Sequence, residues 1–178
     1  MITFVMDHLP ALACIMGYLV ALKMFHVRRR RMFLLINAAS CLPFVYYLLS
    51  EQAFTGALVS SMVGINCLLM AALPEHDSPR VKKLRVGFAL TVIACGTWFM
   101  YKAPSDLLPM LAFIIARLGE TQSNTQRIRY AFMPVQLLWM GYGYLSGAYV
   151  IVGGEFALLL SNLLASNRHR RTQKMAVE

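Results

Sequence analysis

The chain has 178 residues, of which 58% are hydrophobic and only 14% are charged. Soluble domains are nearer half apolar and a quarter charged, so this composition excludes an ordinary soluble domain and indicates that lipid covers much of the surface. The net charge of +9 does not indicate nucleic acid as a partner, because the basic residues sit in short segments between apolar stretches and form no face interleaved with aromatic residues.

Seven apolar segments are candidates for membrane-spanning helices, which need about 20 residues each. The fifth segment is short, and its polar end, Arg117 to Glu120, is expected to continue as helix beyond the hydrocarbon. The sequence therefore predicts an all-α integral membrane protein, a single domain over residues 1–178, with seven transmembrane helices at residues 3–25, 32–50, 53–73, 86–102, 106–119, 130–147 and 149–166.

The basic residues fix a predicted orientation. Except for Lys102, they lie in four segments that alternate spans bring to one side of the membrane, namely Lys23 with Arg28–Arg31, Arg80 with Lys82, Lys83 and Arg85, Arg117 with Arg127 and Arg129, and Arg168 with Arg170, Arg171 and Lys174. Basic loops stay in the cytoplasm, so the N-terminus is expected outside and the C-terminus inside. The same face is expected to meet anionic lipid headgroups.

Short strings recur along the chain at a nearly constant offset. Asp7-His8-Leu9-Pro10 and Asp106-Leu107-Leu108-Pro109 lie 99 positions apart, and Asn66 and Asn162 lie 96 apart. This pattern predicts two parallel three-helix repeats, residues 1–73 and 105–167, joined by a cytoplasmic loop and linker helix at 74–104 and followed by a basic tail at 168–178. Asp7 and Asp106 are interpreted as caps of the first and fifth helices.

The local sequence resembles the YgjV-like family of bacterial inner-membrane proteins. The similar stretches include the basic run into Met32-Phe33-Leu34-Leu35, Phe54-Thr55-Gly56-Ala57 and Leu138-Trp139-Met140-Gly141-Tyr142-Gly143. The 3+1+3 plan and Trp139-x-x-Tyr142-Gly143 are also similar to the SWEET, SemiSWEET and PQ-loop transporters. This resemblance implies a multi-pass protein of the bacterial inner membrane, and a solute pocket that Trp139 lines together with a residue of the last helix.

Glu155 is the sharpest candidate for function, because a charged group well inside a membrane helix costs about 2.5 to 3.5 kcal/mol on insertion scales. It takes the position at which the resemblance leads us to expect a neutral amide. One interpretation is a carboxyl that binds a proton or a cationic solute. The other is a carboxyl near the outer interface that bonds a neighbouring helix.

Trp139 and Tyr142 share one face of the sixth helix, where they are expected to form a wall for a flat solute or part of the aromatic belt at the interface. Asn66 and Asn162 are expected to line the pathway or to make interhelical hydrogen bonds. Tyr47 and Tyr144 begin a further pair of matching strings 97 positions apart. At offsets of 97 or 96, the first repeat places Leu42 or Pro43 opposite Trp139, and Leu58 or Val59 opposite Glu155.

Catalysis is not expected, since no Ser-His-Asp set, no HExxH motif and no cluster of acids with histidines is visible. The cysteines at 14, 41, 67 and 95 lack metal-ligand spacing, so neither a metal nor a cofactor is expected. We therefore predict a transporter of a small polar solute that works by alternating access, with proton or cation coupling as an option. The alternative is a non-transporting receptor, assembly or lipid-interacting protein on the same fold, and both a monomer and a homodimer are compatible with the plan.

Overall fold

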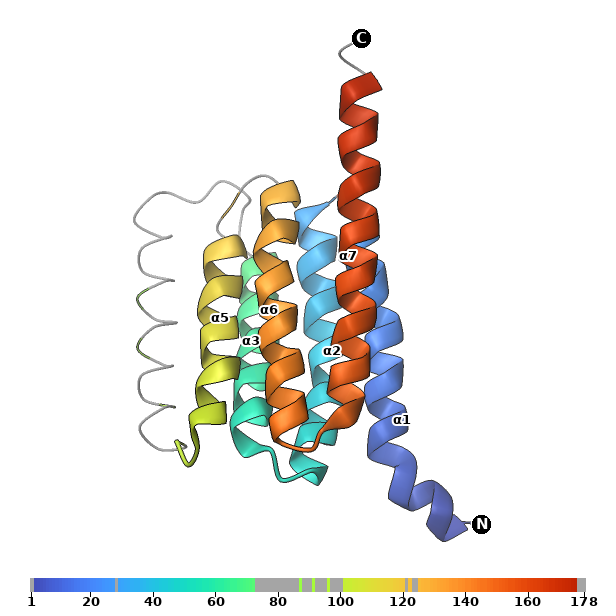
Figure 1. Ribbon diagram of the computed structural model, residues 1–178, viewed down its shortest axis with the longest axis vertical. Helices are drawn as coiled ribbons and strands as arrows, with labels where there is room; N and C mark the ends of the chain where they lie inside the picture. Colours follow the sequence, from blue (N-terminus) through green and yellow to red (C-terminus); the bar gives the residue numbers. More distant parts are fainter. Residues whose placement is uncertain are drawn as a thin grey trace.

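The predicted apolar segments fold into long helices in the computed structural model, which describes residues 2–27, 29–72, 87, 91, 96, 101–120, 122 and 125–175 (Figure 1). Side chains are described from residue 8 to residue 168 within these ranges. The described residues form six α-helices and two short 3₁₀-helices, and they contain no strand. The helices are α1 (Ile2–Leu22), η1 (Lys23–His26), α2 (Arg30–Ser50), α3 (Phe54–Ala72), η2 (Pro104–Asp106), α5 (Leu107–Glu120), α6 (Thr125–Leu145) and α7 (Tyr149–Met175).

Six of the seven predicted segments correspond to these helices. The remaining predicted segment, the fourth in chain order (residues 86–102), lies outside the described residues except at positions 87, 91, 96, 101 and 102. Four described helices are long and apolar enough to cross a membrane, over His8–His26, Arg30–Ser50, Phe54–Ala72 and Tyr149–Arg168. α5 has only 14 residues, which is about 21 Å of helix, and α6 begins with the polar run Thr125 to Arg129. α7 also continues to Met175, past its predicted end at 166.

The six helices form a closed ring. Each helix packs against its neighbours in the chain within the first group (α1, α2, α3) and within the second group (α5, α6, α7). The ring closes where α3 packs against α5 and where α1 packs against α7 (Figure 1). The two groups therefore face each other across a common interior.

The two ends of the ring differ in charge. At one end, called here the basic end, η1 and the start of α2 lie near the end of α5 and the start of α6, and this end carries Lys23, Arg30, Arg117 and Arg129. The opposite end contains η2 and the turns at 51–53 and 146–148 (Figure 1).

Tight turns join the last two helices of each group at the opposite end. α2 ends in a Schellman motif, in which Ala53 N donates to Leu48 O and Gln52 N donates to Leu49 O, while Gln52 adopts a left-handed φ of 56°. α6 ends at a turn in which Gly147 has a φ of 77°, a conformation that glycine adopts at little cost. Such short turns force both helix pairs to run antiparallel.

The same spacing relates the helices of the two groups. α2 and α6 each have 21 residues, and their bounds lie 95 positions apart at both ends. The starts of α3 and α7, at Phe54 and Tyr149, are also 95 apart. The left-handed residues Gln52 and Gly147 repeat this spacing. It is shorter than the offsets of 96 to 99 between the matching strings of the sequence.

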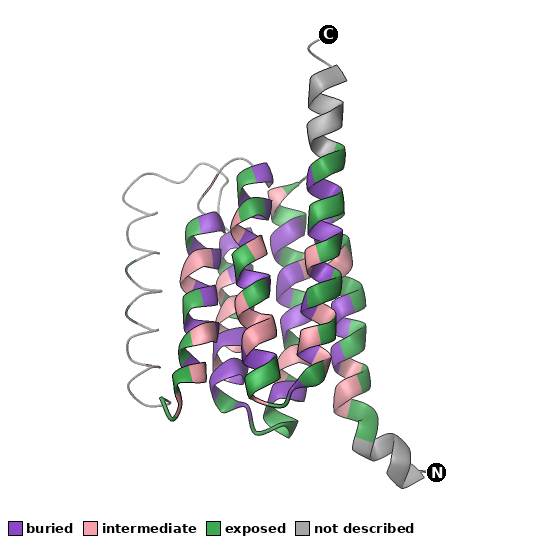
Figure 2. Ribbon diagram, viewed as in Figure 1, coloured by how far each residue is buried: buried purple, intermediate pink, exposed green. Residues whose placement is uncertain are grey.

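Many residues on the outer side of the ring are exposed (Figure 2), and large apolar side chains are among them. Leu42 is 75% exposed, Ile65 61% and Leu164 60%. A surface with so many exposed apolar side chains suits contact with lipid. The interior is packed by small and aromatic residues that include Cys14, Ala21, Phe25 and Ala112.

The two aspartates interpreted as helix caps behave differently. Asp7 lies inside α1, because that helix begins at Ile2. Asp106 ends η2 just before α5, and its Oδ2 accepts hydrogen bonds from the backbone N–H groups of Lys102 (2.9 Å) and Ala103 (3.0 Å). It therefore secures the segment that precedes it instead of capping the first turn of α5.

Candidate functional site

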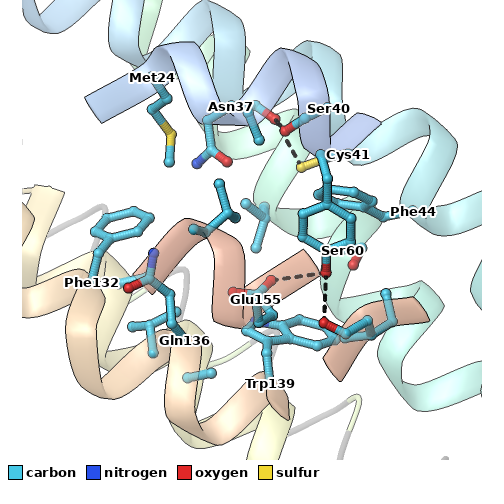
Figure 3. Close-up of a pocket in the computed structure, with 18 of the residues that line it drawn as sticks. Met24, Asn37, Ser40, Cys41, Phe44, Ser60, Phe132, Gln136, Trp139 and Glu155 are labelled. Carbon is cyan, nitrogen blue, oxygen red and sulfur yellow. Dashed lines mark hydrogen bonds between the residues drawn. The ribbon is translucent and has the colours of Figure 1, made fainter. Parts of the chain in front are cut away.

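The ring of helices encloses a central cavity (Figure 3). The space in which the centres of water-sized molecules fit is about 70 Å³, enough for roughly five waters at about 10 to 15 Å³ each. Every helix of the ring contributes to its wall. The wall is mostly apolar, and its polar side chains are Tyr18, Asn37, Ser40, Ser60, Arg117, Gln136, Trp139 and Glu155.

Many wall residues form pairs that lie 95 positions apart, one from each three-helix group. Trp139 corresponds in this way to Phe44, and Glu155 corresponds to Ser60. The other pairs are Tyr18 with Phe113, Ala21 with Ala116, Asn37 with Phe132, Ser40 with Val135, Cys41 with Gln136, and Val63 with Leu158. This spacing differs by one to two residues from the predicted register, which placed Leu42 or Pro43 opposite Trp139 and Leu58 or Val59 opposite Glu155.

Glu155 lies in the second turn of α7 and is 8% exposed. Its Oε1 accepts a hydrogen bond of 3.1 Å from the hydroxyl of Tyr18 on α1, which also lies 3.4 Å from the carbonyl of Ile151. The neighbouring Gly154 makes this approach possible, since a Cβ there would overlap the Tyr18 ring. The contact joins the two groups across the α1–α7 seam and points the carboxyl into the cavity (Figure 3).

Gln136 and Trp139 bring a polar and an aromatic surface into the cavity from one face of α6 (Figure 3). Gln136 is 2% exposed, and neither its Nε2 nor its Oε1 has a hydrogen-bond partner among the described residues. Buried amide groups rarely stay without partners, so we expect a ligand or water to bind this side chain. The sequence analysis missed Gln136, although its spacing of three residues from Trp139 places both on one helix face.

Arg117 is a cavity residue that the sequence analysis treated only as a determinant of orientation. Its guanidinium is buried, stacks 5.0 Å from the centre of the Phe113 ring and donates to Glu120 Oε1 at 2.5 Å. Its Nε and Nη1 have no partner among the described residues. The helix continues through its polar end to Glu120, and this end is packed inside the protein, with Arg117 6% and Glu120 1% exposed.

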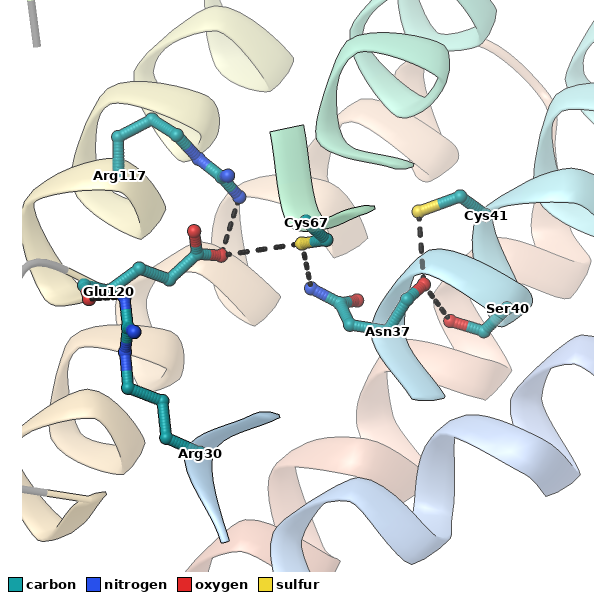
Figure 4. A network of polar contacts seen from close by, with 7 residues as sticks. All are labelled: Arg30, Asn37, Ser40, Cys41, Cys67, Arg117 and Glu120. Atoms are coloured by element: carbon teal, nitrogen blue, oxygen red, sulfur yellow. Dashed lines mark hydrogen bonds and ion pairs between the residues drawn. The ribbon is translucent and has the colours of Figure 1, made fainter. Parts of the chain in front are cut away.

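Polar contacts connect this ion pair to the first group (Figure 4). Cys67 Sγ lies 3.8 Å from Glu120 Oε1 and accepts a hydrogen bond of 3.3 Å from Asn37 Nδ2. Arg30 Nη2 donates to the carbonyl of Glu120 at 3.4 Å. The network joins α2, α3 and α5 at the basic end, and Asn37 and Arg117 extend it into the cavity wall.

The other predicted site residues lie outside the cavity wall. Tyr142 accepts a hydrogen bond of 3.1 Å from Gly56 N in the first turn of α3, and its ring packs edge-on against Trp139 at 5.9 Å. Asn162 is fully buried, and its Nδ2 donates to the carbonyl of Arg129 at 2.8 Å. Asn66 is half-buried, and its Nδ2 has no partner among the described residues. The structure therefore brings Trp139 and Glu155 together but not the two asparagines.

A second hollow opens at the opposite end. Its volume by the same measure is about 450 Å³, and its wall includes Glu51, Lys102, Asp106, Tyr142 and Ser146. Tyr142 borders this hollow and also contacts Trp139 of the cavity wall. It is therefore placed between the hollow and the cavity.

Comparison with known proteins identifies a family. The sequence profile of Imp-YgjV, described as a bacterial inner membrane protein, matches residues 9–173. No curated protein and no solved structure matches the chain.

Proposed function

The chain belongs to the Imp-YgjV family of bacterial inner membrane proteins, and from that premise we propose that it transports a small polar solute by alternating access. The observation that carries the proposal is the central cavity, which lies between two three-helix groups and whose wall has a carboxyl, a guanidinium and an amide, that of Gln136, without a partner among the described residues. Polar groups at membrane depth usually serve a solute or ion pathway.

The constant spacing of 95 supports a duplicated three-helix unit of the SWEET-like kind. It relates the helix bounds, the turns and the pairs of wall residues. It also relates two tyrosines that each reach from one group to the other, because the hydroxyl of Tyr142 binds the N–H of Gly56 and the hydroxyl of Tyr47 interacts with the backbone of Val150. A cavity between two such units is where repeat-built transporters bind their solutes.

In the proposed orientation the basic end faces the cytoplasm, as the positive-inside rule requires. Its exposed basic side chains, such as Arg29 and Arg31, then meet anionic lipid headgroups. The linking span predicted from the sequence at residues 86–102 is the part of this proposal that gives both units the same orientation.

Transport requires that each end of the ring opens in turn while the other stays closed. At the basic end, Phe132 of α6 packs edge-on against Phe25 and Phe33 of the first group, with ring centres 6.3 Å and 5.4 Å apart. At the opposite end, the Tyr142–Gly56 contact separates the hollow from the cavity. Both closures lie on the seam between the groups. Rocking one group against the other therefore opens one closure while the other stays closed.

The accessibility of Ser60 tests this pathway without knowledge of the solute. Ser60 lines the cavity, whereas the adjacent Ser61 donates a hydrogen bond of 2.9 Å to Ala57 O in its own helix and does not. In a chain whose native cysteines are replaced by serine, Ser60→Cys is expected to react with a membrane-impermeant methanethiosulfonate added from either side. Ser61→Cys is the matched control. Reaction of Ser60→Cys from neither side, or from one side only under all conditions, contradicts alternating access.

Glu155 is the proposed site of proton or cation coupling. The titratable and charged groups that share the cavity with it are Tyr18 of α1, Cys41 of α2 and Arg117 of α5. In proteoliposomes that take up a solute, Glu155→Gln is expected to abolish the pH dependence of the uptake rate. Unchanged coupling in this variant removes Glu155 from the mechanism while leaving transport itself in place.

A receptor or assembly protein without transport is the second candidate. In that case the aromatic packing at the basic end and the Tyr142–Gly56 contact at the opposite end keep both ends closed permanently. Labelling of Ser60→Cys from neither side, in a protein that is folded and monodisperse, favours this alternative over transport.

A further inference from the structure

We infer that the solute is a small zwitterion, with its carboxylate bound by Arg117 and its ammonium group by Glu155. The inference rests on the proposed function, because it names the class of solute for the same cavity. It starts from the opposite charges in the wall, where one side chain of each sign is nine-tenths or more buried.

Arg117 has binding capacity left over. One of its nitrogens, Nη2, donates to Glu120, while Nε and Nη1 are buried without a partner among the described residues. A buried charged donor without an acceptor costs more than a neutral one, so these N–H groups favour an anionic ligand. Arginine is the side chain best suited to bind a carboxylate.

Glu155 supplies the complementary charge. Its Oε1 accepts a hydrogen bond from the neutral hydroxyl of Tyr18, and Arg117 in the cavity wall already pairs with Glu120. A carboxylate in a largely apolar enclosure is stabilised by a cationic ligand. An ammonium group also has the donors that a carboxylate oxygen accepts.

The axial positions of the two charges suit one small molecule. α5 and α7 both begin at the opposite end (Figure 1), and Arg117 lies ten residues into α5 whereas Glu155 lies six residues into α7. At about 1.5 Å per residue, Arg117 lies about 15 Å along α5 and Glu155 about 9 Å along α7. Both side chains line the same cavity, so a zwitterion that lies along the bundle can present one charge to each.

Gln136 provides a neutral contact for such a solute. Its amide lines the cavity and offers both a donor and an acceptor that are unpaired among the described residues. Trp139, Phe44 and Phe113 form apolar wall for the rest of the molecule. The free volume, which holds about five waters, limits the solute to a few non-hydrogen atoms in this closed state.

The test uses free amino acids of increasing side-chain size, together with the amide and the deaminated acid of each. Binding to the purified full-length chain in nanodiscs is measured by titration calorimetry. At least one free amino acid is expected to bind at least about tenfold more tightly than its amide and its deaminated acid, because each analogue loses one charge-assisted contact. The inference is overturned if no free amino acid binds, or if a blocked analogue binds equally well.

Paired variants separate binding from folding. In Arg117→Gln/Glu120→Gln, which removes both charges of the ion pair, the free amino acid and its amide are expected to bind equally. In Glu155→Gln, the free amino acid and the deaminated acid are expected to bind equally. Gln136→Leu removes no hydrogen bond among the described residues, so it is expected to preserve the melting temperature and to weaken binding about tenfold. Ser61→Ala, outside the cavity, is the matched control.

The outcomes distinguish the inference from the function on which it rests. If Ser60→Cys reacts from both sides but a neutral polyol is transported, and the double variant transports it normally, transport stands and the zwitterion class fails. If free amino acids bind more tightly than both blocked analogues, and each variant loses the discrimination expected of it, but Ser60→Cys reacts from neither side, the binding site stands and transport fails.

Discussion

The two ends of the bundle join the same three-helix groups with different chemistry. At the basic end the contacts involve charged side chains. Arg129 Nη2 donates to the carbonyl of Phe25 at 2.7 Å, and Arg30 donates to the carbonyl of Glu120 at 3.4 Å. At the opposite end, the neutral hydroxyls of Tyr142 and Tyr47 meet backbone groups of Gly56 and Val150.

Under the proposed alternating access, this difference predicts different free-energy costs for opening the two ends. Hydrogen bonds with an ionised partner are roughly twice as strong as neutral ones. The basic end also carries the edge-on packing of Phe25, Phe33 and Phe132, with ring centres 5.4 to 6.3 Å apart. The opposite end already contains a hollow of about 450 Å³ that reaches Tyr142. Separation of the groups is therefore expected to begin at the opposite end.

The largest effect is expected at the basic end, from the buried ion pair. Arg117→Gln leaves the carboxylate of Glu120 buried without its partner, and such a loss costs about 3 to 5 kcal/mol in the free energy of unfolding. Arg117→Gln/Glu120→Gln removes both charges and is expected to recover most of that loss. Thermal or denaturant unfolding in detergent measures both variants. Equal losses in the single and double variants contradict the importance of the charge balance.

A smaller effect is expected halfway between the ends, at the contact of Tyr18 with α7. Gly154→Ala places a Cβ against the Tyr18 ring, so the ring must move and the hydrogen bond to Glu155 is lost. Overpacking of this kind costs about 1 to 3 kcal/mol. Gly153→Ala is the matched control, since a Cβ there meets nothing within 4 Å; it is expected to raise the melting temperature, because alanine is the better helix former. If both variants lose a similar amount of stability, the effect comes from the helix and not from Tyr18.

The helices followed from the sequence because membrane-spanning helices need a long apolar segment. Five of the predicted starts lie within two residues of the observed ones, and α6 begins five residues earlier, at Thr125 instead of 130. The polar start of α6 concealed this, since Arg127 and Arg129 resemble a loop on the basic side. Arg129 instead donates into the bundle, to the carbonyl of Phe25.

The correspondence between the two three-helix groups was predicted less well than the helices, for a geometrical reason. Short strings of leucine and alanine match at several offsets, and one residue of error rotates a position by about 100° around a helix. The offset of 96 paired Asn66 with Asn162, whereas the spacing of 95 places Ser161 opposite Asn66. This difference accounts for two amides that do not meet in the cavity.

The positions of Arg117 and Gln136 in the cavity wall could be established only from the structure. A basic residue near the end of a predicted span looks like a topology signal, and its burial depends on helices far away in the chain. Gln136 shares a face with Trp139, a relation that was readable in the sequence once Trp139 was singled out. Glu155 was predicted from its place within an apolar segment, and the structure places it on the cavity wall in the second turn of α7.

The smallest change in stability, but the most direct test of the two ends, is expected from Tyr142→Phe. The variant removes a neutral hydrogen bond to Gly56 N, and interhelical bonds of this kind are worth about 0.6 kcal/mol in membranes. If opening begins at the opposite end, even this small loss shifts the population toward that open state, and Ser60→Cys reacts about threefold faster with reagent added from the side of the opposite end. Tyr144→Phe is the control, because Tyr144 is 67% exposed. Faster reaction from the basic side, or no change from either side, contradicts the proposed order of opening.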